Sequence, residues 1–288
     1  MGKLVIIGIV IILLILIILY FRSEYEKNSF VLIRYKFKSK KIKTAKKVIF
    51  ISDLHDKQFG EDNEKLINAI DECKPDFIVI GGDMMVTKGL VDLKPSLLFC
   101  EKLAKKYKVY YANGNHELRL KSEKYAGLYA ELNKSVKKMG IYRLEDSFEK
   151  TEDICIYGLD IDKKYYKKLD NAEFDKSYIE KKLGSAKEQY YNILLAHSPL
   201  FLNAYADWGA DLVLSGHFHG GTIRVWKDIG LMTPQIHFFS DMVHGLKKKN
   251  DTNLIISSGL GTHSINIRLN DRAELILIEL LPLHTDKD

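Results

Sequence analysis

The sequence predicts an α/β domain that is preceded by one membrane-spanning helix. The first observation is an unbroken apolar run, rich in Ile and Leu, at residues 4–21 of the 288-residue chain. The second is the alternation of short apolar runs with amphipathic stretches after residue 48, which is typical of strands that alternate with helices. We therefore divide the chain into an N-terminal membrane anchor (1–21), a basic stem with a possible edge strand (22–47) and one α/β domain (48–288).

The apolar run is long enough to cross a bilayer as a helix, for which about 18 residues suffice. A cleaved signal peptide is the alternative, but no small-x-small cleavage site follows the run. The run ends in Tyr20 and Phe21 and is followed by Arg22, which suits a membrane boundary. We therefore expect an uncleaved, single-pass anchor in the cell membrane.

The net charge of +6 is concentrated beside this anchor. Residues 22–47 carry ten Lys and Arg against two Glu, whereas residues 48–288 sum to −3. Contact with anionic lipid headgroups explains such a segment, and so does a solvated linker or a Lys-protected edge strand. Nucleic-acid binding would need the positive charge on the domain itself. We expect the lipid bilayer as a partner and no nucleic acid, and no feature indicates a protein partner.

The alternation after the anchor defines the secondary structure. Three- to eight-residue apolar runs predict strands at 30–37, 48–52, 77–80, 109–112, 154–157, 193–196, 212–214, 254–256 and 275–278. Amphipathic stretches predict helices at 62–73, 93–106 and 123–138, and residues 160–190 should hold a further helix and an exposed insertion. Leu66, Ile67 and Ile70 have the helical spacing, and Pro75 helps to end that helix.

Side chains that can bind metal follow the ends of five of these strands: Asp53, Asp83, Asn115, His197 and His217. Three further histidines lie within two residues of them: His55, His116 and His219. In an open α/β sheet the carboxyl ends of the strands gather at one edge, where sites form. Imidazole and carboxylate bind borderline divalent metals such as Mn, Fe, Zn or Co. The set is too large for one tetrahedral ion, which favours a two-metal site.

These residues fall into five blocks: Asp53-Leu-His55, Gly82-Asp83, Gly114-Asn-His-Glu117, His197 and Gly216-His-Phe-His219. Their order resembles that of the calcineurin-like metallophosphoesterase superfamily. The segments 216–221 and 258–261 are similar to its membrane-associated branch of bacterial phosphodiesterases, which includes YkuE-like proteins and enzymes that hydrolyse UDP-2,3-diacylglucosamine. The resemblance implies that residues 48–288 form a four-layer α/β/β/α metallophosphoesterase sandwich with a dinuclear site.

The resemblance also implies a role for each residue. Asp53, His55 and His219 would bind one ion. The other ion would be bound by Asn115, His197 and His217, and Asp83 would bridge the two. Manganese is the ion that we expect first, with Fe, Zn or Co as alternatives. Two cations about 3.5–4 Å apart can share a hydroxide, lower its pKa and clamp the phosphate for attack. His116 would stabilise the phosphorus centre or protonate the leaving oxygen.

The chain departs from many relatives three residues after the bridging Asp83, where it has Val86 in place of an acid or a tyrosine. An Fe(III)–tyrosinate centre is therefore not expected. A carboxylate partner for His116 is also missing at that position, and Glu117 and Asp92 are the candidates to replace it.

Three further sets of residues are candidates for contact with substrate. The guanidinium of Arg268 matches phosphate geometry, although a surface salt bridge explains this residue equally well. Tyr165 and Tyr166 could form a substrate cap, but we interpret them as part of a solvated helix face. His237 and His244 are candidates for lining the cleft.

We expect a membrane-anchored hydrolase that cleaves a lipid-linked or nucleotide-sugar phosphodiester. A phosphomonoesterase or protein phosphatase is the alternative enzyme, and a non-catalytic scaffold is disfavoured because the ligand set and His116 are intact. The basic stem favours a cytoplasmic domain. The short N-terminal tail and the family resemblance favour an extracytoplasmic one.

Overall fold

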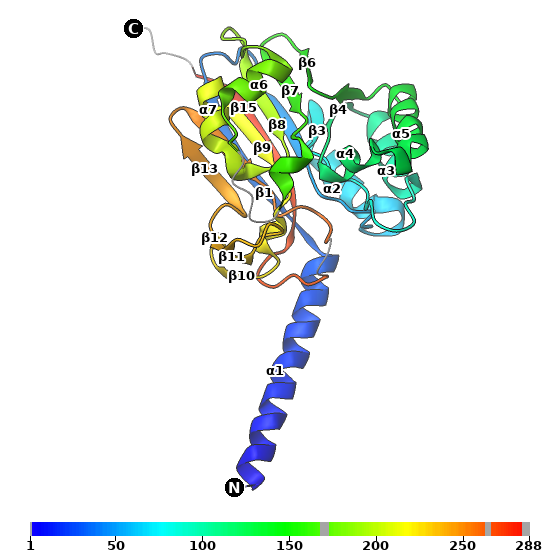
Figure 1. The fold of residues 1–288 in the computed structure, drawn as a ribbon, viewed down its shortest axis with the longest axis vertical. Helices are drawn as coiled ribbons and strands as arrows, with labels where there is room; N and C mark the ends of the chain where they lie inside the picture. The colour runs from blue at the N-terminus through cyan, green and yellow to red at the C-terminus, as the bar shows by residue number, and fades with distance from the viewer. Residues whose placement is uncertain (1, 168–172, 263–265, 284–288) are drawn as a thin grey trace.

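A computed structural model of the chain describes residues 2–167, 173–262 and 266–283. Helix α1 (Gly2–Asn28) projects from the rest of the molecule (Figure 1). Among the described residues it is the one helix long and apolar enough to span a membrane, and its apolar part is not buried. The predicted anchor is thus helical, and the helix continues into the first residues of the predicted stem.

Two six-stranded sheets form the centre of the domain. In the first sheet the strands lie in the order β1 (Phe30–Ser39), β15 (Ala273–Pro282), β2 (Lys46–Ile51), β3 (Phe77–Ile80), β4 (Lys108–Ala112), β5 (Tyr142–Leu144). In the second they lie in the order β13 (Gly245–Lys249), β14 (Thr252–Ile256), β9 (Leu212–Ser215), β8 (Tyr191–Ala196), β7 (Ile154–Leu159), β6 (Ser147–Lys150). A small third sheet contains β10 (Arg224–Trp226), β11 (Ile229–Met232) and β12 (Phe238–Ser240).

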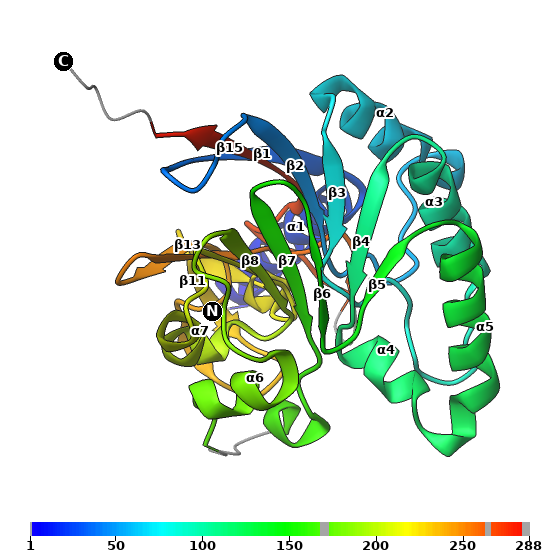
Figure 2. The same ribbon diagram turned by 90° about the horizontal axis from the view of Figure 1, so that it is seen from above.

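Helices cover the outer face of each large sheet, which gives the predicted four layers (Figure 2). The first sheet carries α2 (Glu64–Cys73), α3 (Lys94–Ala104) and α5 (Ala126–Lys138). The second carries α6 (Lys176–Leu183) and α7 (Leu202–Trp208). Helix α4 (Asn115–Leu120) follows β4, and the short 3-10 turns are Glu61–Asn63, Glu123–Tyr125, Lys163–Tyr166, Pro199–Phe201 and His219–Gly221.

Successive side chains of a strand point to opposite faces of its sheet. In the two large sheets both faces are covered. In β2, Ile49 and Ile51 pack with the helices of the first sheet. Val48 and Phe50 point the other way, into the core between the sheets, where they join side chains such as Ile193 of β8. Continuous apolar runs therefore mark strands that are covered on both sides.

All nine predicted strands are confirmed, and β1 is an edge strand, parallel to β15. The shorter strands β5, β6 and β10–β13 were not predicted, because their three to five residues lack a sustained apolar run. The predicted helix at 123–138 begins as a 3-10 turn and becomes α-helical at Ala126.

Candidate metal centre

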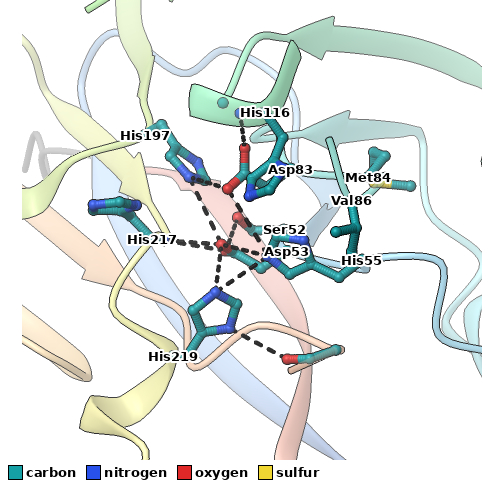
Figure 3. A network of polar contacts seen from close by, with 12 residues as sticks. Ser52, Asp53, His55, Asp83, Met84, Val86, His116, His197, His217 and His219 are labelled. Atoms are coloured by element: carbon teal, nitrogen blue, oxygen red, sulfur yellow. Dashed lines mark hydrogen bonds and ion pairs between the residues drawn. The ribbon is translucent and has the colours of Figure 1, made fainter. Parts of the chain in front are cut away.

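The predicted ligands come from the ends of strands in both large sheets. Asp53, Asp83 and Asn115 follow β2, β3 and β4 of the first sheet, whereas His197 and His217 follow β8 and β9 of the second. The expectation of a single sheet edge is therefore wrong. The two sheets face each other, and the ends of their strands bring the side chains together between them (Figure 3).

The backbone of the ligand turns adopts a conformation that most residues avoid. Five predicted ligands have a left-handed φ: Asp53, His55, Asp83, His217 and His219. Such residues cost on the order of 1–3 kcal/mol each and persist where the surrounding structure holds them. Here the amide of Asp53 donates to Gly82 O (3.0 Å) and that of His55 to Asp83 O (3.1 Å). These bonds tie the first two ligand turns together.

Glycine is required where these turns meet. Gly82 has a φ of +96°, and a Cβ on it would lie 2.0 Å from the backbone nitrogen of Gly114. The Gly-Asp and Gly-Asn-His-Glu blocks therefore need their glycines for close approach of the two backbones.

The first predicted ligand group is assembled in the structure. Nε2 of His219 lies 3.2 Å from Nε2 of His55 and 3.5 Å from Oδ1 of Asp53. Nε2 of His55 lies 3.9 Å from the same Asp53 oxygen. Two imidazole nitrogens and a carboxylate oxygen therefore converge on one point, as ligands of a metal ion do.

The second group lies beside the first. Asp83, His197 and His217 have ligand atoms within 4.8 Å of one another. Oδ2 of Asp83 is 3.1 Å from Nε2 of His197 and 3.9 Å from Nε2 of His55. Asp83 is thus within reach of both groups, which is the position that the resemblance implies for a bridging carboxylate.

Backbone carbonyls orient two of the imidazoles. Nδ1 of His197 lies 2.8 Å from Gly81 O, and Nδ1 of His219 lies 3.2 Å from Gly261 O. A proton on each Nδ1 satisfies these carbonyls and leaves the Nε2 lone pair facing the centre. Such outer contacts are what fix the tautomer of metal-binding histidines.

The donor set fits a metal ion. Oδ1 of Asn115 and Nε2 of His217 are buried, and neither has a hydrogen-bond partner among the described residues. Leaving a buried polar atom unsatisfied costs about 1–3 kcal/mol. A divalent cation at this position would satisfy both atoms and the nearby carboxylates.

Charge and burial shift the pKa values of the centre. Burial alone would raise the pKa of Asp83, but His197 and His116 hold that pKa well below its usual range. Burial and the neighbouring His197 lower the pKa of His217 well below its usual value. Asp83 is therefore ionised and His217 neutral, which are the forms that bind metal. Against the effect of burial, Asp83 and Asp53 raise the pKa of His197 to about 10, so a metal ion there would displace a proton.

His116 lies at the N-terminal end of α4, and its ring centroid is 4.9 Å from that of His55. The amide of Thr87 donates to its Nδ1 (2.7 Å), and its own amide donates to Oδ1 of Asp83 (2.7 Å). The side chain lines a cavity of about 440 Å³ at the centre. This places His116 where the resemblance expects a group that acts on the substrate.

Glu117 has a role that the sequence interpretation missed. Its two carboxylate oxygens accept the amides of Asp83 (2.8 Å), Met84 (2.9 Å) and Gly114 (2.9 Å) and the hydroxyl of Tyr111 (2.8 Å). It therefore holds the turn that carries Asp83, and is not a substitute acid for His116. The Gly114-x-x-Glu117 spacing, in which the acid accepts the amide of the N-cap residue as in one half of a capping box, is the signal that indicates this role. The other candidate, Asp92, is exposed and accepts the amide of Lys94.

Tyr166 also lines the cavity, together with the cationic side chains of Arg119, Lys163 and Lys167. Its ring centroid is 4.9 Å from that of His217, and Tyr165 beside it is buried. The interpretation of these tyrosines as a solvated helix face is wrong, because both rings pack inward.

Arg268 is buried, with 1% of its surface exposed. Its guanidinium donates to the carbonyls of Ser258 (2.8 Å), Gly259 (3.1 Å) and Gly261 (2.7 Å) and to the carboxylate of Asp271 (3.2 Å). The predicted phosphate contact is not supported, because these groups occupy both terminal nitrogens of the guanidinium and its Nε is buried. Arg268 instead holds the turn whose Gly261 carbonyl orients His219.

Neither His237 nor His244 is among the described residues that line the cavity. His244 forms ion pairs with Glu274 (2.7 Å) and Asp228 (3.1 Å). Neither partner lines the cavity, so His244 does not line the cleft as the sequence suggested.

Comparisons with known proteins agree with this geometry. The model of the calcineurin-like phosphoesterase family matches residues 46–221. The uncharacterized metallophosphoesterase YkoQ of Bacillus subtilis (strain 168) is 28% identical over 79% of this chain and 81% of its own length. The Campylobacter jejuni metallophosphoesterase Cj0846 is 29% identical over 83% of this chain. The alignment spans 60% of the length of that relative.

A solved structure with the same fold is the protein TT1561 of Thermus thermophilus. It superimposes with a TM-score of 0.50 over 75% of this chain and 91% of its own, at 13% identity. At this identity the likeness concerns the fold alone.

Proposed function

The chain belongs to the calcineurin-like phosphoesterase family, and from this premise we propose that it hydrolyses a phosphodiester at a membrane with two divalent metal ions, Mn²⁺ being the first candidate. The family and the His/Asp clusters support a metal-dependent phosphoesterase. The observation that carries the two-metal proposal is Oδ2 of Asp83, which lies 3.1 Å from Nε2 of His197 and 3.9 Å from Nε2 of His55. One carboxylate therefore reaches both ligand groups.

When bound, the two ions would lower the pKa of a water molecule between them and neutralise the phosphate oxygens. The ligands proposed for one ion are Asp53, His55 and His219, those for the other are Asn115, His197 and His217, and Asp83 would serve both. His116 would donate a hydrogen bond from its Nε2–H to an oxygen of the phosphate, because its Nδ1 accepts the Thr87 amide (2.7 Å). Arg119, Lys163 and Lys167 would attract an anionic substrate into the same cavity.

The preference for a diester, lipid-linked or part of a nucleotide sugar, rests on the similarity of segments 216–221 and 258–261 to membrane-associated phosphodiesterases. Helix α1 supports attachment to a membrane, because its apolar part is exposed over its whole length. For the side of the membrane we favour an extracytoplasmic domain. The family resemblance supports this side, and the ten Lys and Arg of residues 22–47 stand against it.

The experiment measures how fast the full chain hydrolyses two soluble esters. The chain is purified in detergent, stripped of metal with EDTA and reloaded with Mn²⁺. We expect hydrolysis of bis-p-nitrophenyl phosphate to exceed that of p-nitrophenyl phosphate, and we expect His116→Asn to abolish most of it. Faster hydrolysis of the monoester or of phosphopeptides would replace this proposal with a phosphomonoesterase or protein phosphatase. Hydrolysis of neither ester would contradict the enzyme proposal.

A further inference from the structure

The last turn of α1 is fixed to the domain. Ser23 and Glu26 are its buried residues. Oγ of Ser23 accepts the amide of Arg268 (3.1 Å), and Oε2 of Glu26 accepts the amide of Asp271 (2.8 Å). Two buried hydrogen bonds to one loop set the direction of the helix relative to the domain, so α1 does not act as a loose tether.

The same loop is bonded to the small third sheet. The amide of Arg224 in β10 donates to Leu269 O (2.9 Å), and the side-chain amide of Asn270 donates to Arg224 O (3.1 Å). Loop 266–272 therefore joins the anchor on one side to β10 on the other. Figure 1 shows the result, with β10, β11 and β12 at the end of the domain from which α1 projects.

This end of the molecule is unusually apolar on its surface. Outside α1, nine large hydrophobic side chains are exposed among the described residues, and five of them lie on β10, β12 or loop 266–272. They are Val225, Trp226, Phe238, Phe239 and Ile267, and we call them the aromatic platform. Trp226, Phe239 and Phe238 are 69%, 64% and 60% exposed. Scattered exposed hydrophobics need no explanation, but a cluster of them marks a contact surface.

The segment that carries most of the platform, residues 219–240, also contributes to the wall of the metal cavity. Pro234, in the turn between β11 and β12, lines the cavity, and so does His219, which lies five residues before Arg224. A substrate held against the platform would therefore have a short path to the metal centre.

We propose that the aromatic platform lies in the headgroup region of the bilayer that α1 crosses, and that the substrate is a membrane amphiphile whose phosphodiester is drawn from that surface. This inference rests on the proposed anchoring of α1. Aromatic rings favour the membrane interface, and Lys227, exposed next to Trp226, would face anionic headgroups. Because α1 already holds the domain at the membrane, the second contact is intramolecular and needs little intrinsic affinity.

Tryptophan fluorescence tests the contact without depending on activity. The chain has two tryptophans, and Trp208 is buried whereas Trp226 is exposed. The full chain is reconstituted into vesicles of phosphatidylethanolamine and phosphatidylglycerol in equal parts, with or without brominated acyl chains. We expect brominated lipid to quench the wild-type emission and to quench the Trp226→Phe variant much less. Equal quenching of the two proteins would overturn the proposal. So would an absence of quenching in the wild type because a second copy of the chain covers Trp226.

Hydrolysis in vesicles tests the second half of the proposal. The substitution Phe238→Ser combined with Phe239→Ser should reduce hydrolysis of vesicle-borne hexadecyl p-nitrophenyl phosphate roughly tenfold, which corresponds to about 1.4 kcal/mol. It should leave soluble bis-p-nitrophenyl phosphate hydrolysis unchanged. The matched control is Leu283→Ser, at an exposed apolar residue that follows β15, with both rates expected to match the wild type. An unchanged vesicle rate in the double variant would overturn the access route. Failure to hydrolyse even the soluble ester would instead refute the proposed function, while the fluorescence result would still stand.

Discussion

Oδ2 of Asp83 and Nε2 of His197 lie 3.1 Å apart although the two residues follow strands of different sheets. The other oxygen of Asp83, Oδ1, accepts the amide of His116 at the start of α4 (2.7 Å). The two carboxylate oxygens therefore have separate tasks. One fixes the orientation of the side chain, and the other remains directed at the imidazoles of both ligand groups.

Replacing His116 with Asn should reduce hydrolysis of bis-p-nitrophenyl phosphate by about 10²–10³-fold, the range expected for loss of one hydrogen-bond donor to the transition state. The metal content should not change, because His116 is not a predicted ligand. Steady-state kinetics and elemental analysis of the same preparation measure both. A variant that loses metal together with activity would show that His116 serves the metal site instead.

Glu117→Gln should weaken metal binding by roughly 10–100-fold, as loss of an outer contact to a ligand does. The side-chain amide of Gln has one oxygen, so it can accept fewer hydrogen bonds from the backbone N–H groups of the Asp83 turn. Its NH₂ group would face the remaining N–H groups. Titration of Mn²⁺ into stripped protein measures the affinity. Glu101→Gln is the control, since Glu101 pairs with Lys105 on the surface of α3, away from the ligand turns. Equal affinity of both variants would contradict the role given to Glu117.

The strand ends that carry the ligands can be predicted from sequence, because five of the nine apolar runs are followed within three residues by a metal-capable side chain from one of the five blocks. Which sheet each strand joins cannot be predicted in this way. The runs at 48–52 and 193–196 have the same pattern, yet one enters the first sheet and the other the second. Pairing between distant strands depends on the packing of the whole core, which no local pattern contains.

The buried contacts of polar side chains could not be predicted from the sequence either. Nothing in the sequence around Arg268, which lies between Ile267 and Leu269, indicates its partners, but the structure surrounds it with carbonyls of segment 258–261. Tyr166 lies among lysines in the sequence, yet its ring packs on His217. In both cases the deciding partner is distant along the chain or is a backbone group, and side-chain chemistry alone does not reveal it.

Arg268→Gln should destabilise the fold by about 3–5 kcal/mol, because it leaves the buried Asp271 carboxylate without one of its cationic partners. Thermal unfolding measures this loss. At a temperature where the variant remains folded, KM for the soluble diester should stay close to that of the wild type. A raised KM with unchanged stability would instead support the phosphate contact that the sequence suggested.

The His244–Glu274 ion pair should make stability depend on pH. Burial alone would lower the pKa of His244, but Glu274 and Asp228 raise it above its ordinary value of 6.5, and Arg224 opposes them. A raised pKa in the folded state gives stability that is fully present below pH 6.5 and is lost as the pH rises through the folded value. Urea unfolding of EDTA-treated protein should show this decline above pH 6.5. His244→Gln should flatten it, and an unchanged slope in that variant would contradict the assignment.

The metal content of the purified chain tests the central claim most directly. After EDTA treatment, reloading with Mn²⁺ and removal of free ion, elemental analysis should find two ions per chain in the wild type. Asp83→Asn should hold fewer than two, because the shared carboxylate is lost. A wild-type chain that binds a single ion at saturation, or an Asp83→Asn variant that still binds two, would contradict a centre in which Asp83 bridges two metals.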